Sequence, residues 1–359
     1  MTKDLFDTVR VGTLTLPNRL AMAPMSRSRA DDRGCATSLM ARYYAQRATA
    51  GLIITESIHP SERGRSHLAT PGLHSAEQMR SWREVTGAVH AAGGRIFAQL
   101  AHGGRIGHPI LYSDGGVPVA PSAVASGGMF RTADNVLFDH PVPRALLTGE
   151  VRDVVAEFET AARLAVEAGF DGVELHGGNG HLIHQFLGDN TNLRSDGYGG
   201  SAANRIRFAA EVVEAVAEAI GPHRTAIRLS PGNPYNGMEE AFPASVYACL
   251  LDALPRELAY LHIVEWESRT LVEMLWQRWN GVFMLNPRSG TLPRFAGAFG
   301  SVEGAFDALG CADVVSLGGL WLSNPDLPAR IRVGGPFAEP DMGTVYRGGH
   351  RGYDDYPML

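Results

Sequence analysis

The chain has 359 residues, a formal net charge of −6 and 45% hydrophobic residues, which is typical of a globular protein with a large core. It has no basic run and no apolar segment long enough to cross a bilayer, so we expect neither nucleic acid nor a membrane as a partner. The start lacks the apolar core of a signal peptide, and the three cysteines fit no disulfide or zinc pattern, so we expect a cytoplasmic protein.

Eight apolar segments predict buried strands. Each is short and nearly continuous in its apolar character, as in a parallel sheet that is covered on both faces. In chain order they are residues 19–25, 51–56, 95–100, 170–176, 225–230, 258–264, 281–285 and 313–317.

Helical patterns lie between these strands. Ser75 precedes Gln78 by three residues, which predicts a capping box at the start of a helix. Thr148 is expected to cap another helix, whose apolar residues share one face over residues 151–165. Residues 208–220 repeat this spacing. Eight strands that are each followed by a helix favour a (β/α)8 TIM barrel, with a doubly wound sheet as the alternative.

One connection is long. Residues 102–144 are rich in Gly, Pro and Ser, and we expect them to form an insertion over the barrel mouth. No repeat or linker is evident, so we predict a single domain over residues 1–359.

A polar cluster follows the fourth predicted strand. That strand ends at His176, two glycines turn the chain, and Asn179 and His181 come within five residues. Chemistry in parallel α/β folds lies at the carboxyl ends of the strands. His176 and Asn179 can donate hydrogen bonds to one substrate oxygen, and His181 can exchange a proton with what is held there. From residue type alone, a purely structural role in the turn is an equal alternative.

Several ordered motifs together resemble the Old Yellow Enzyme family of FMN-dependent ene-reductases. They run nearly from end to end of the chain: Ala23-Pro24-Met25-Ser26-Arg27-Ser28-Arg29-Ala30, Tyr43-Tyr44-Ala45-Gln46-Arg47-Ala48, Gln99-Leu100-Ala101-His102, Tyr198-Gly199-Gly200-Ser201, Asn324-Pro325-Asp326-Leu327-Pro328 and Gly352-Tyr353-Asp354-Asp355-Tyr356-Pro357. The resemblance implies a (β/α)8 barrel that binds FMN at its mouth, takes hydride from NADPH or NADH, and reduces the C=C bond of an α,β-unsaturated carbonyl compound. Natural-product biosynthesis is one such use.

The resemblance also implies roles for individual residues. The flavin ring would be held by Pro24, Met25, Ser26, Ser57, Gln99 and Arg228. The substrate would be bound by His176 and Asn179 through its carbonyl oxygen, with Tyr346 and His67 lining the pocket.

The chain departs from the family at the proton donor. His181 stands where the family usually has tyrosine, and the unperturbed pKa of histidine is about 6.5 against about 10. His181 can therefore donate a proton when charged or accept one when neutral, and the alternative is that water supplies the proton. A metal site is not expected, because no carboxylate or thiolate joins the histidines at ligand spacing.

The phosphate end departs further. The seventh strand leads into Asn286-Pro287-Arg288-Ser289-Gly290, where the family has a glycine-rich loop, and proline has no N–H to offer. The eighth leads into Gly318-Gly319, so the family's arginine is missing. Gly318 and Gly319 can still donate backbone N–H groups, and Arg288 can supply the lost charge. Trp321 could instead cover the phosphate site.

Three hypotheses follow, in order of preference. The first is an FMN- and NAD(P)H-dependent ene-reductase, monomeric or homodimeric, acting on a small molecule. The second is a non-reductive tailoring enzyme (an isomerase, cyclase or dehydrogenase) that uses His181 as acid–base, with FMN binding weakened or lost. The third is a non-catalytic or flavin-free barrel that binds a small molecule or a partner protein.

Overall fold

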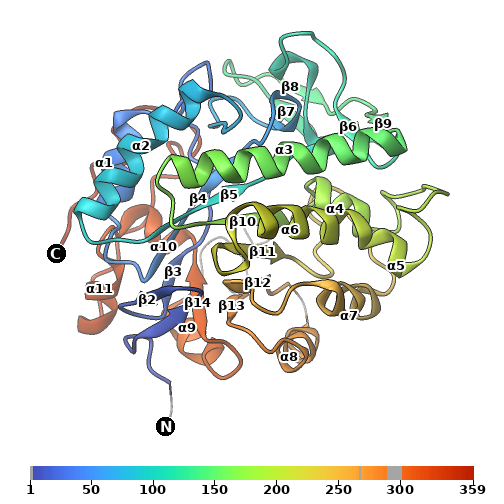
Figure 1. Ribbon diagram of the computed structural model, residues 1–359. Helices are drawn as coiled ribbons and strands as arrows, with labels where there is room; N and C mark the ends of the chain where they lie inside the picture. Colours follow the sequence, from blue (N-terminus) through green and yellow to red (C-terminus); the bar gives the residue numbers. More distant parts are fainter. Residues whose placement is uncertain (1–2, 267, 289–300) are drawn as a thin grey trace.

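Eight parallel strands close into a barrel in the computed structural model, which describes residues 3–266, 268–288 and 301–359 (Figure 1). The prediction of a TIM barrel is confirmed, and the doubly wound sheet is excluded. In barrel order the strands are β3 (Leu20–Met22), β4 (Leu52–Ile58), β5 (Ile96–Leu100), β10 (Gly172–Gly177), β11 (Thr225–Leu229), β12 (Tyr260–Val264), β13 (Phe283–Asn286) and β14 (Val314–Leu317). Each matches one of the eight predicted segments.

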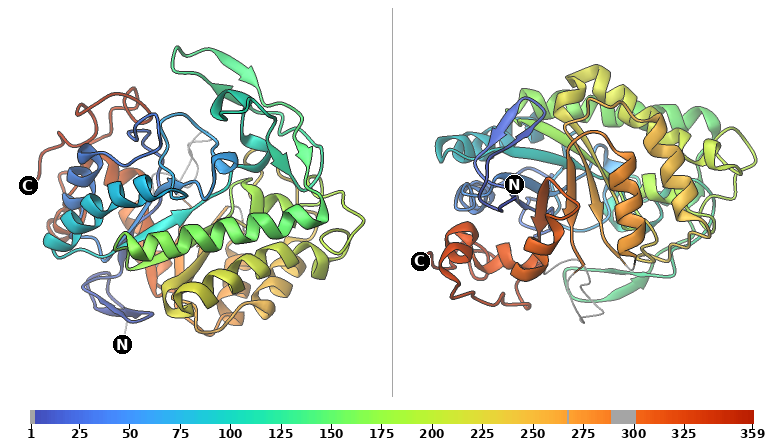
Figure 2. Two further views of the ribbon diagram at one scale, coloured as in Figure 1. Left: turned by 45° about the horizontal axis from the view of Figure 1, so that its top comes forward. Right: turned by 90° about the horizontal axis from the view of Figure 1, so that it is seen from below.

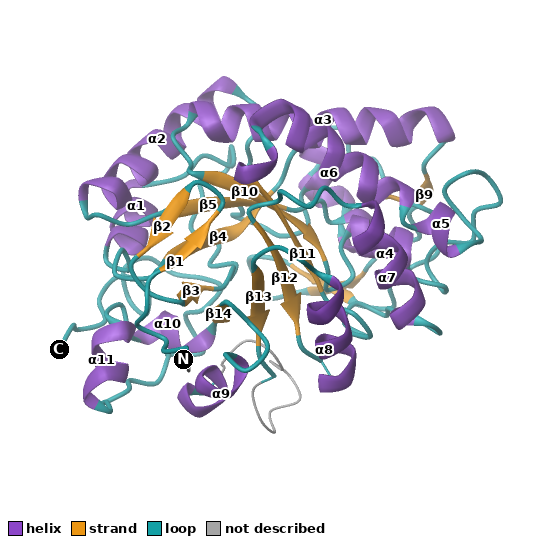
Figure 3. Ribbon diagram, turned by 60° about the horizontal axis from the view of Figure 1, so that its bottom comes forward, coloured by secondary structure: helices purple, strands orange, loops and turns teal. Residues whose placement is uncertain are grey.

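Helices surround the barrel (Figure 3). They are α1 (Ser38–Ala45), α2 (Ala76–Ala91), α3 (Thr148–Glu167), α4 (Leu182–Leu187), α5 (Ala202–Arg205), α6 (Arg207–Ile220), α7 (Pro243–Ala253), α8 (Arg269–Arg278), α9 (Val302–Ala308), α10 (Gly319–Ser323) and α11 (Leu327–Val333). Four single 3₁₀ turns occur at Glu62–Gly64, Gly104–Ile106, Pro109–Leu111 and Pro222–Arg224. No helix in the described ranges is long and apolar enough to cross a membrane.

Ser75 is the N-cap of α2, as predicted, and its Oγ accepts a hydrogen bond from the Gln78 N–H at 3.2 Å. The predicted capping box is incomplete, because the side-chain oxygen of Gln78 accepts from the His74 N–H at 2.9 Å and not from the N–H of Ser75. Thr148, in contrast, is not the cap of α3, because Leu147 occupies that position and its N–H donates to the Glu150 carboxylate at 2.7 Å. The hydroxyl of Thr148 donates to Asp196 instead, at 2.7 Å.

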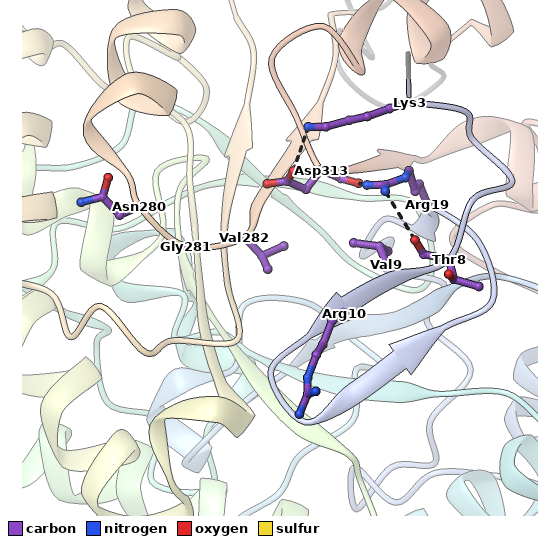
Figure 4. Close-up of a pocket in the computed structure, with 9 residues that line it drawn as sticks. All are labelled: Lys3, Thr8, Val9, Arg10, Arg19, Asn280, Gly281, Val282 and Asp313. Carbon is purple, nitrogen blue, oxygen red and sulfur yellow. Dashed lines mark hydrogen bonds and ion pairs between the residues drawn. The ribbon is translucent and has the colours of Figure 1, made fainter. Parts of the chain in front are cut away.

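The amino-terminal end of the barrel is closed by a hairpin of β1 (Val9–Val11) and β2 (Leu14–Leu16). Val11 and Leu16 are buried in one apolar cluster with residues of the barrel interior, such as Phe97. Beside this hairpin lies a surface hollow, in which Lys3 pairs with Asp313 at 2.8 Å (Figure 4). Residues at this end of a TIM barrel serve stability rather than chemistry.

The long connection after β5 carries four short strands: β6 (Val119–Ala120), β7 (Met129–Arg131), β8 (Leu137–Asp139) and β9 (Arg144–Ala145). β7 and β8 form an antiparallel hairpin that extends from the body of the molecule (Figure 2). The buried Arg105 joins this connection to the loop after β11, because its guanidinium donates to the carbonyls of Ala125, Asn236 and Gly237 at 2.8–3.1 Å. That residues 1–359 form one domain stays a prediction.

A bulge interrupts the pairing of β4 with β5. Ile54 pairs with Phe97, but the next pair is Ser57 with Gln99, so β4 has one residue more than β5 between these pairs. The hydroxyl of Thr55 accepts the Gln99 N–H at 3.0 Å and so satisfies a donor that the bulge frees. Beyond the bulge, Ser57 lies beside Gln99, with their side chains 3.1 Å apart.

Candidate active site

The loop after β10 brings His176, Asn179 and His181 together at the carboxyl end of the barrel. His176 is the last residue but one of β10 and is 3% exposed, while His181 caps the start of α4 and is half-buried. The two imidazole rings lie edge to face, with centroids 4.5 Å apart. Nδ1 of each ring is buried without a hydrogen-bond partner among the described residues. Both rings therefore keep a polar atom for a ligand.

Asn179 has a left-handed backbone conformation (φ 52°), which asparagine tolerates better than most residues. The loop after β11 fixes it. The Asn179 N–H donates to Ser230 Oγ at 2.7 Å, and its carbonyl accepts from the Asn236 amide at 2.8 Å.

The peptide after Asn179 is held from α4. The Gly180 N–H donates to His184 Nδ1 at 2.9 Å, and its carbonyl accepts from Gln185 Nε2 at 2.7 Å. His184 Nε2 in turn lies 3.3 Å from the buried carboxylate of Glu240, which comes from the β11 loop. Polar contacts on both sides thus fix the loop that carries the candidate residues.

Three imidazoles of this region, those of His181, His102 and His176, are neutral at physiological pH. Burial, together with the neighbouring His67, lowers the pKa of His181 to about 3. Burial and the nearby His181 likewise lower the pKa of His102 to about 3, and burial, His181 and Arg228 lower that of His176 well below its usual value. A hydrogen bond from these rings is therefore donated by a neutral N–H group.

A buried polar network fills the upper barrel interior. Glu174 accepts from Gln99 Nε2 at 2.8 Å and lies 2.8 Å from His262 Nδ1, while His262 Nε2 lies 2.7 Å from Ser316 Oγ. Burial alone would raise the pKa of Glu174, but His262, Arg228 and Gln99 outweigh it, and the net shift is downward. Burial lowers the pKa of His262. The Glu174 carboxylate therefore accepts from Nδ1–H of His262.

Arg228 lies next to His176 on the adjacent strand, since the two residues pair in the β10–β11 register. Its Nη2 donates to Asn286 Oδ1 at 2.9 Å, and Nδ2 of Asn286 donates to the Ser316 carbonyl at 2.9 Å. Nε of Arg228 is buried without a partner in the described part of the chain. Nη2 of Arg228 is thus bonded to Asn286, and Nε remains available to donate a hydrogen bond to a ligand.

The remaining residues expected at the flavin ring follow β3 and lie on β4. Pro24, Met25, Ser26 and Ser57 are all half-buried, as residues of a cavity wall are. The amide of Gln99 has one contact at each end, so one N–H and one oxygen lone pair remain.

These residues fit the ring end of FMN. A flavin's pyrimidine edge offers carbonyl oxygens and an imide N–H, and here it would meet the Gln99 amide, the open Arg228 Nε and the Ser57 backbone. At the phosphate end, Gly318 and Gly319 begin α10, and the side chain of Arg288 is exposed while its N–H donates to Glu265 at 3.0 Å. Pro287 precedes it, and Ser289 and Gly290 lie outside the described residues.

The ring of Trp321 is fully buried in the core, and its indole N–H donates to the Ala21 carbonyl on β3 at 3.2 Å. That Trp321 covers or occupies the phosphate site stays a prediction.

The two residues expected to line the substrate lie at the rim. His67 is exposed, with Nδ1 2.9 Å from Ser66 Oγ. Tyr346 is 56% exposed, and burial and the nearby Tyr235 raise its pKa. The carbonyl of Val345, adjacent to Tyr346, accepts from Arg27 Nε at 3.0 Å, which ties the carboxyl-terminal segment to the segment after β3.

The residues that support the site were not predicted. Glu174, His262, Ser316, Asn286 and Asn233 are buried polar residues, and none of them was assigned a role. The available signal was a polar side chain at an inward position of an otherwise apolar strand, as at Glu174 and His262.

The chain is similar to known flavin-dependent oxidoreductases. Residues 4–336 match the model of a family described as NADH:flavin oxidoreductase / NADH oxidase. A probable flavin mononucleotide-dependent alkene reductase of Leishmania infantum is 38% identical, over 97% of this chain and 96% of the relative. The chanoclavine-I aldehyde reductase of Penicillium roqueforti is 39% identical, over 99% and 96%.

Solved structures are equally similar. Morphinone reductase superposes with a TM-score of 0.92 at 39% identity, covering 100% of this chain and 97% of that one. A complex of morphinone reductase with tetrahydroNAD gives 0.91 at 41% identity, covering 99% and 98%.

Proposed function

This chain belongs to the NADH:flavin oxidoreductase / NADH oxidase family, the Old Yellow Enzyme family, and on that premise we propose how its residues act on an α,β-unsaturated carbonyl compound. It is an FMN-dependent oxidoreductase with NADPH or NADH as reductant. Bound FMN supplies the hydride that reduces the C=C bond. One observation carries the proposal: Nδ1 of His176, which pairs with Arg228 in the strand register, has no partner among the described residues, and three residues later the NH₂ group of Asn179 has none either.

His176 and Asn179 bind the carbonyl oxygen of the substrate. Negative charge grows on this oxygen while the β-carbon is reduced, and two fixed donors stabilise it in a site from which water is largely excluded. Because the pKa of His176 is low, its ring donates as a neutral imidazole, as its burial requires.

Gln99, Ser57 and Arg228 hold the pyrimidine edge of the flavin, with Pro24, Met25 and Ser26 along the ring. Arg228 is the cation of this end of the site, and a positive charge there stabilises negative charge on a reduced ring. At the phosphate, Gly318 and Gly319 donate backbone N–H groups and Arg288 supplies the charge.

His181 does not act as an imidazolium, since its pKa is about 3. A neutral imidazole can give its N–H proton only if its other nitrogen takes one up. We therefore propose that the proton which reaches the α-carbon comes from water, either directly or through His181. The low pKa also makes His181 a weak base, which argues against the hypothesis of a non-reductive acid–base enzyme.

Several finer points belong to the same proposal. Tyr346 and His67 contact the far end of a small-molecule substrate at the rim. The protein acts in the cytoplasm, as a monomer or homodimer. Three free cysteines in the described chain support the reducing compartment.

The test is spectroscopic. The purified protein, with and without excess FMN, is reduced anaerobically with NADPH or NADH, and 2-cyclohexenone is then added. We expect a bound-flavin spectrum that the nicotinamide bleaches and the enone restores. Bleaching without restoration by any activated alkene would contradict the proposed substrate class. The variant Asn179→Ala, with its flavin retained, should lose most of the enone step and little of the bleaching.

A further inference from the structure

The side-chain amide of Asn179 has its oxygen already engaged. Oδ1 accepts a hydrogen bond from Nδ2 of Asn233, which is 54 residues away on the β11 loop, at 3.1 Å. The N–H and the carbonyl of Asn179 are also occupied, by Ser230 and Asn236. The NH₂ group of Asn179 has no partner among the described residues, so it is the donor that remains for a ligand.

The orientation of an asparagine amide is not fixed by its shape. The oxygen and the NH₂ group occupy nearly the same space, so the side chain can present either of them after a half-turn. For a substrate carbonyl the difference is decisive, because the NH₂ group donates to that oxygen while the amide oxygen repels it.

The contacts of Asn233 settle this choice. Its Oδ1 accepts from the backbone N–H of Tyr235 at 2.9 Å. A backbone N–H can only donate, so the oxygen of Asn233 must face it and the NH₂ group must face Asn179. That group can in turn only donate, so the oxygen of Asn179 faces it. The direction of the hydrogen bonds is therefore fixed by the Tyr235 N–H, through the amide of Asn233 and then that of Asn179, up to the ligand.

We propose that Asn233 is a positioning residue that fixes the amide of Asn179 with its NH₂ group toward the substrate oxygen. The inference rests on the proposed role of Asn179. Asn233 is 4% exposed and its NH₂ group is bonded to Asn179, so we infer that it acts through that residue and not on the substrate.

Three variants separate this role from simple support of the loop. Asn233→Asp places an acceptor opposite Asn179, which turns its NH₂ group away from the substrate. Asn233→Ala removes the bias and leaves both orientations open. Asn236→Ala is the matched control, because it removes a hydrogen bond of similar length from the Asn179 backbone carbonyl without acting on the amide.

The measurement is the dissociation constant of 2-cyclohexenone from the oxidised, FMN-loaded protein, determined by ligand-observed NMR without NAD(P)H. At pH 7.5 we expect Asn233→Asp to weaken binding about tenfold to a hundredfold, the cost of one hydrogen bond at the oxygen. Asn233→Ala should weaken it only about twofold, because half of the molecules keep the competent orientation.

A pH series adds a readout that loop damage would not change. Protonation of the introduced carboxyl makes it a donor again, so the binding defect of Asn233→Asp should diminish as the pH falls toward the carboxyl's pKa. That pKa is near 3.9 in water, and burial raises it. His176, His181, Arg228 and Glu240 face the same loops, so each dissociation constant is divided by the wild-type value at the same pH.

The outcomes are distinguishable. A larger defect in Asn233→Asp than in Asn233→Ala that shrinks on acidification, with a pH-independent ratio for Asn236→Ala, supports the inference. Equal defects in the two Asn233 variants at every pH overturn it. Unchanged binding in Asn179→Ala would refute the donor role of Asn179 itself. Weakened binding in Asn179→Ala, with equal defects in both Asn233 variants, refutes the positioning role alone. Flavin content and thermal melting confirm that each variant is folded.

Discussion

The ring of His181 meets the ring of His176 edge to face, at a centroid distance of 4.5 Å and an interplanar angle of 61°. Two charged imidazoles could not share this contact, and burial keeps the pKa of both rings low. The residue that replaces the family's tyrosine is thus in contact with His176, the residue that we propose binds the substrate oxygen.

The first prediction concerns this replacement. His181→Phe should leave anaerobic flavin reduction by NADPH within about twofold of wild type and slow the enone-dependent step about tenfold, because the proton relay is lost. His181→Tyr should restore the step or exceed wild type. Because the pKa of His181 is about 3, stopped-flow rates of the wild-type enone step should show no inflection near pH 6.5. Such an inflection, absent from His181→Phe, would mean that the imidazolium is the acid.

The second prediction concerns the phosphate end. Gly319→Arg should tighten FMN binding about tenfold to a hundredfold, the value of one charge-assisted hydrogen bond. Arg288→Ala should weaken binding by a similar factor. Both are measured by titrating apoprotein with FMN and following flavin fluorescence. The control is Arg10→Ala, since Arg10 is an exposed arginine at the opposite end of the barrel. An equal loss in the Arg10 and Arg288 variants would argue against a specific role for Arg288.

The third prediction concerns the loss of folding stability at low pH, which we attribute to His59. His59 is 5% exposed, both of its ring nitrogens lack partners among the described residues, and burial, with His74 nearby, lowers its pKa to about 3. The unfolded chain, with a pKa near 6.5, takes up the proton first, so stability is lost as the pH falls from about 6.5 toward about 3.

His59→Leu removes this titration. Between pH 7 and pH 4.5 its free energy of unfolding should fall by about 2–3 kcal/mol less than that of wild type, as measured by urea unfolding. An identical fall in both proteins would show that His59 is protonated in the folded state.

The fourth prediction concerns Gly180, where the β10 loop approaches the β11 loop closely. Gly180 has φ 74°, and a Cβ atom there would lie 2.6 Å from Asn236 Cβ and 2.7 Å from the Tyr235 carbonyl oxygen. Gly180→Ala should therefore push the β10 and β11 loops apart and raise the KM for the enone. Gly127→Ala is the control, since φ is 69° but nothing lies within 4 Å. Both variants should lose about 1–2 kcal/mol from backbone strain, and only Gly180→Ala should lose substrate binding. A raised KM in both would point to general loosening.

The barrel strands could be predicted because strands that are buried on both faces are nearly continuous in their apolar character. The start of α3 could not, since it depends on whether Glu150 reaches back to Leu147 or Thr148 caps the helix itself. The amino-acid sequence is compatible with either cap.

The candidate site shows a similar division. His176, Asn179 and His181 are neighbours in the sequence, so their proximity could be inferred from one strand and one turn. The pair of Glu174 and His262 joins residues 88 apart, and it depends on the register of three adjacent strands. Asn233 was missed for the same reason, because its partner lies across two loops whose conformations the sequence does not specify.

The bulge in β4 decides which side chain lies beside Gln99. Side chains of a regular strand alternate, so residues an even number apart share a side, yet Ile54 and Ser57 both accompany inward residues of β5. The extra residue leaves Glu56 on the other side, where its carboxylate accepts from the Arg27 N–H at 3.1 Å. A strand of the same sequence without the bulge would instead place Glu56, two residues after Ile54, on the inward side. The side chain next to the Gln99 amide thus depends on the bulge as well as on the identities of the residues.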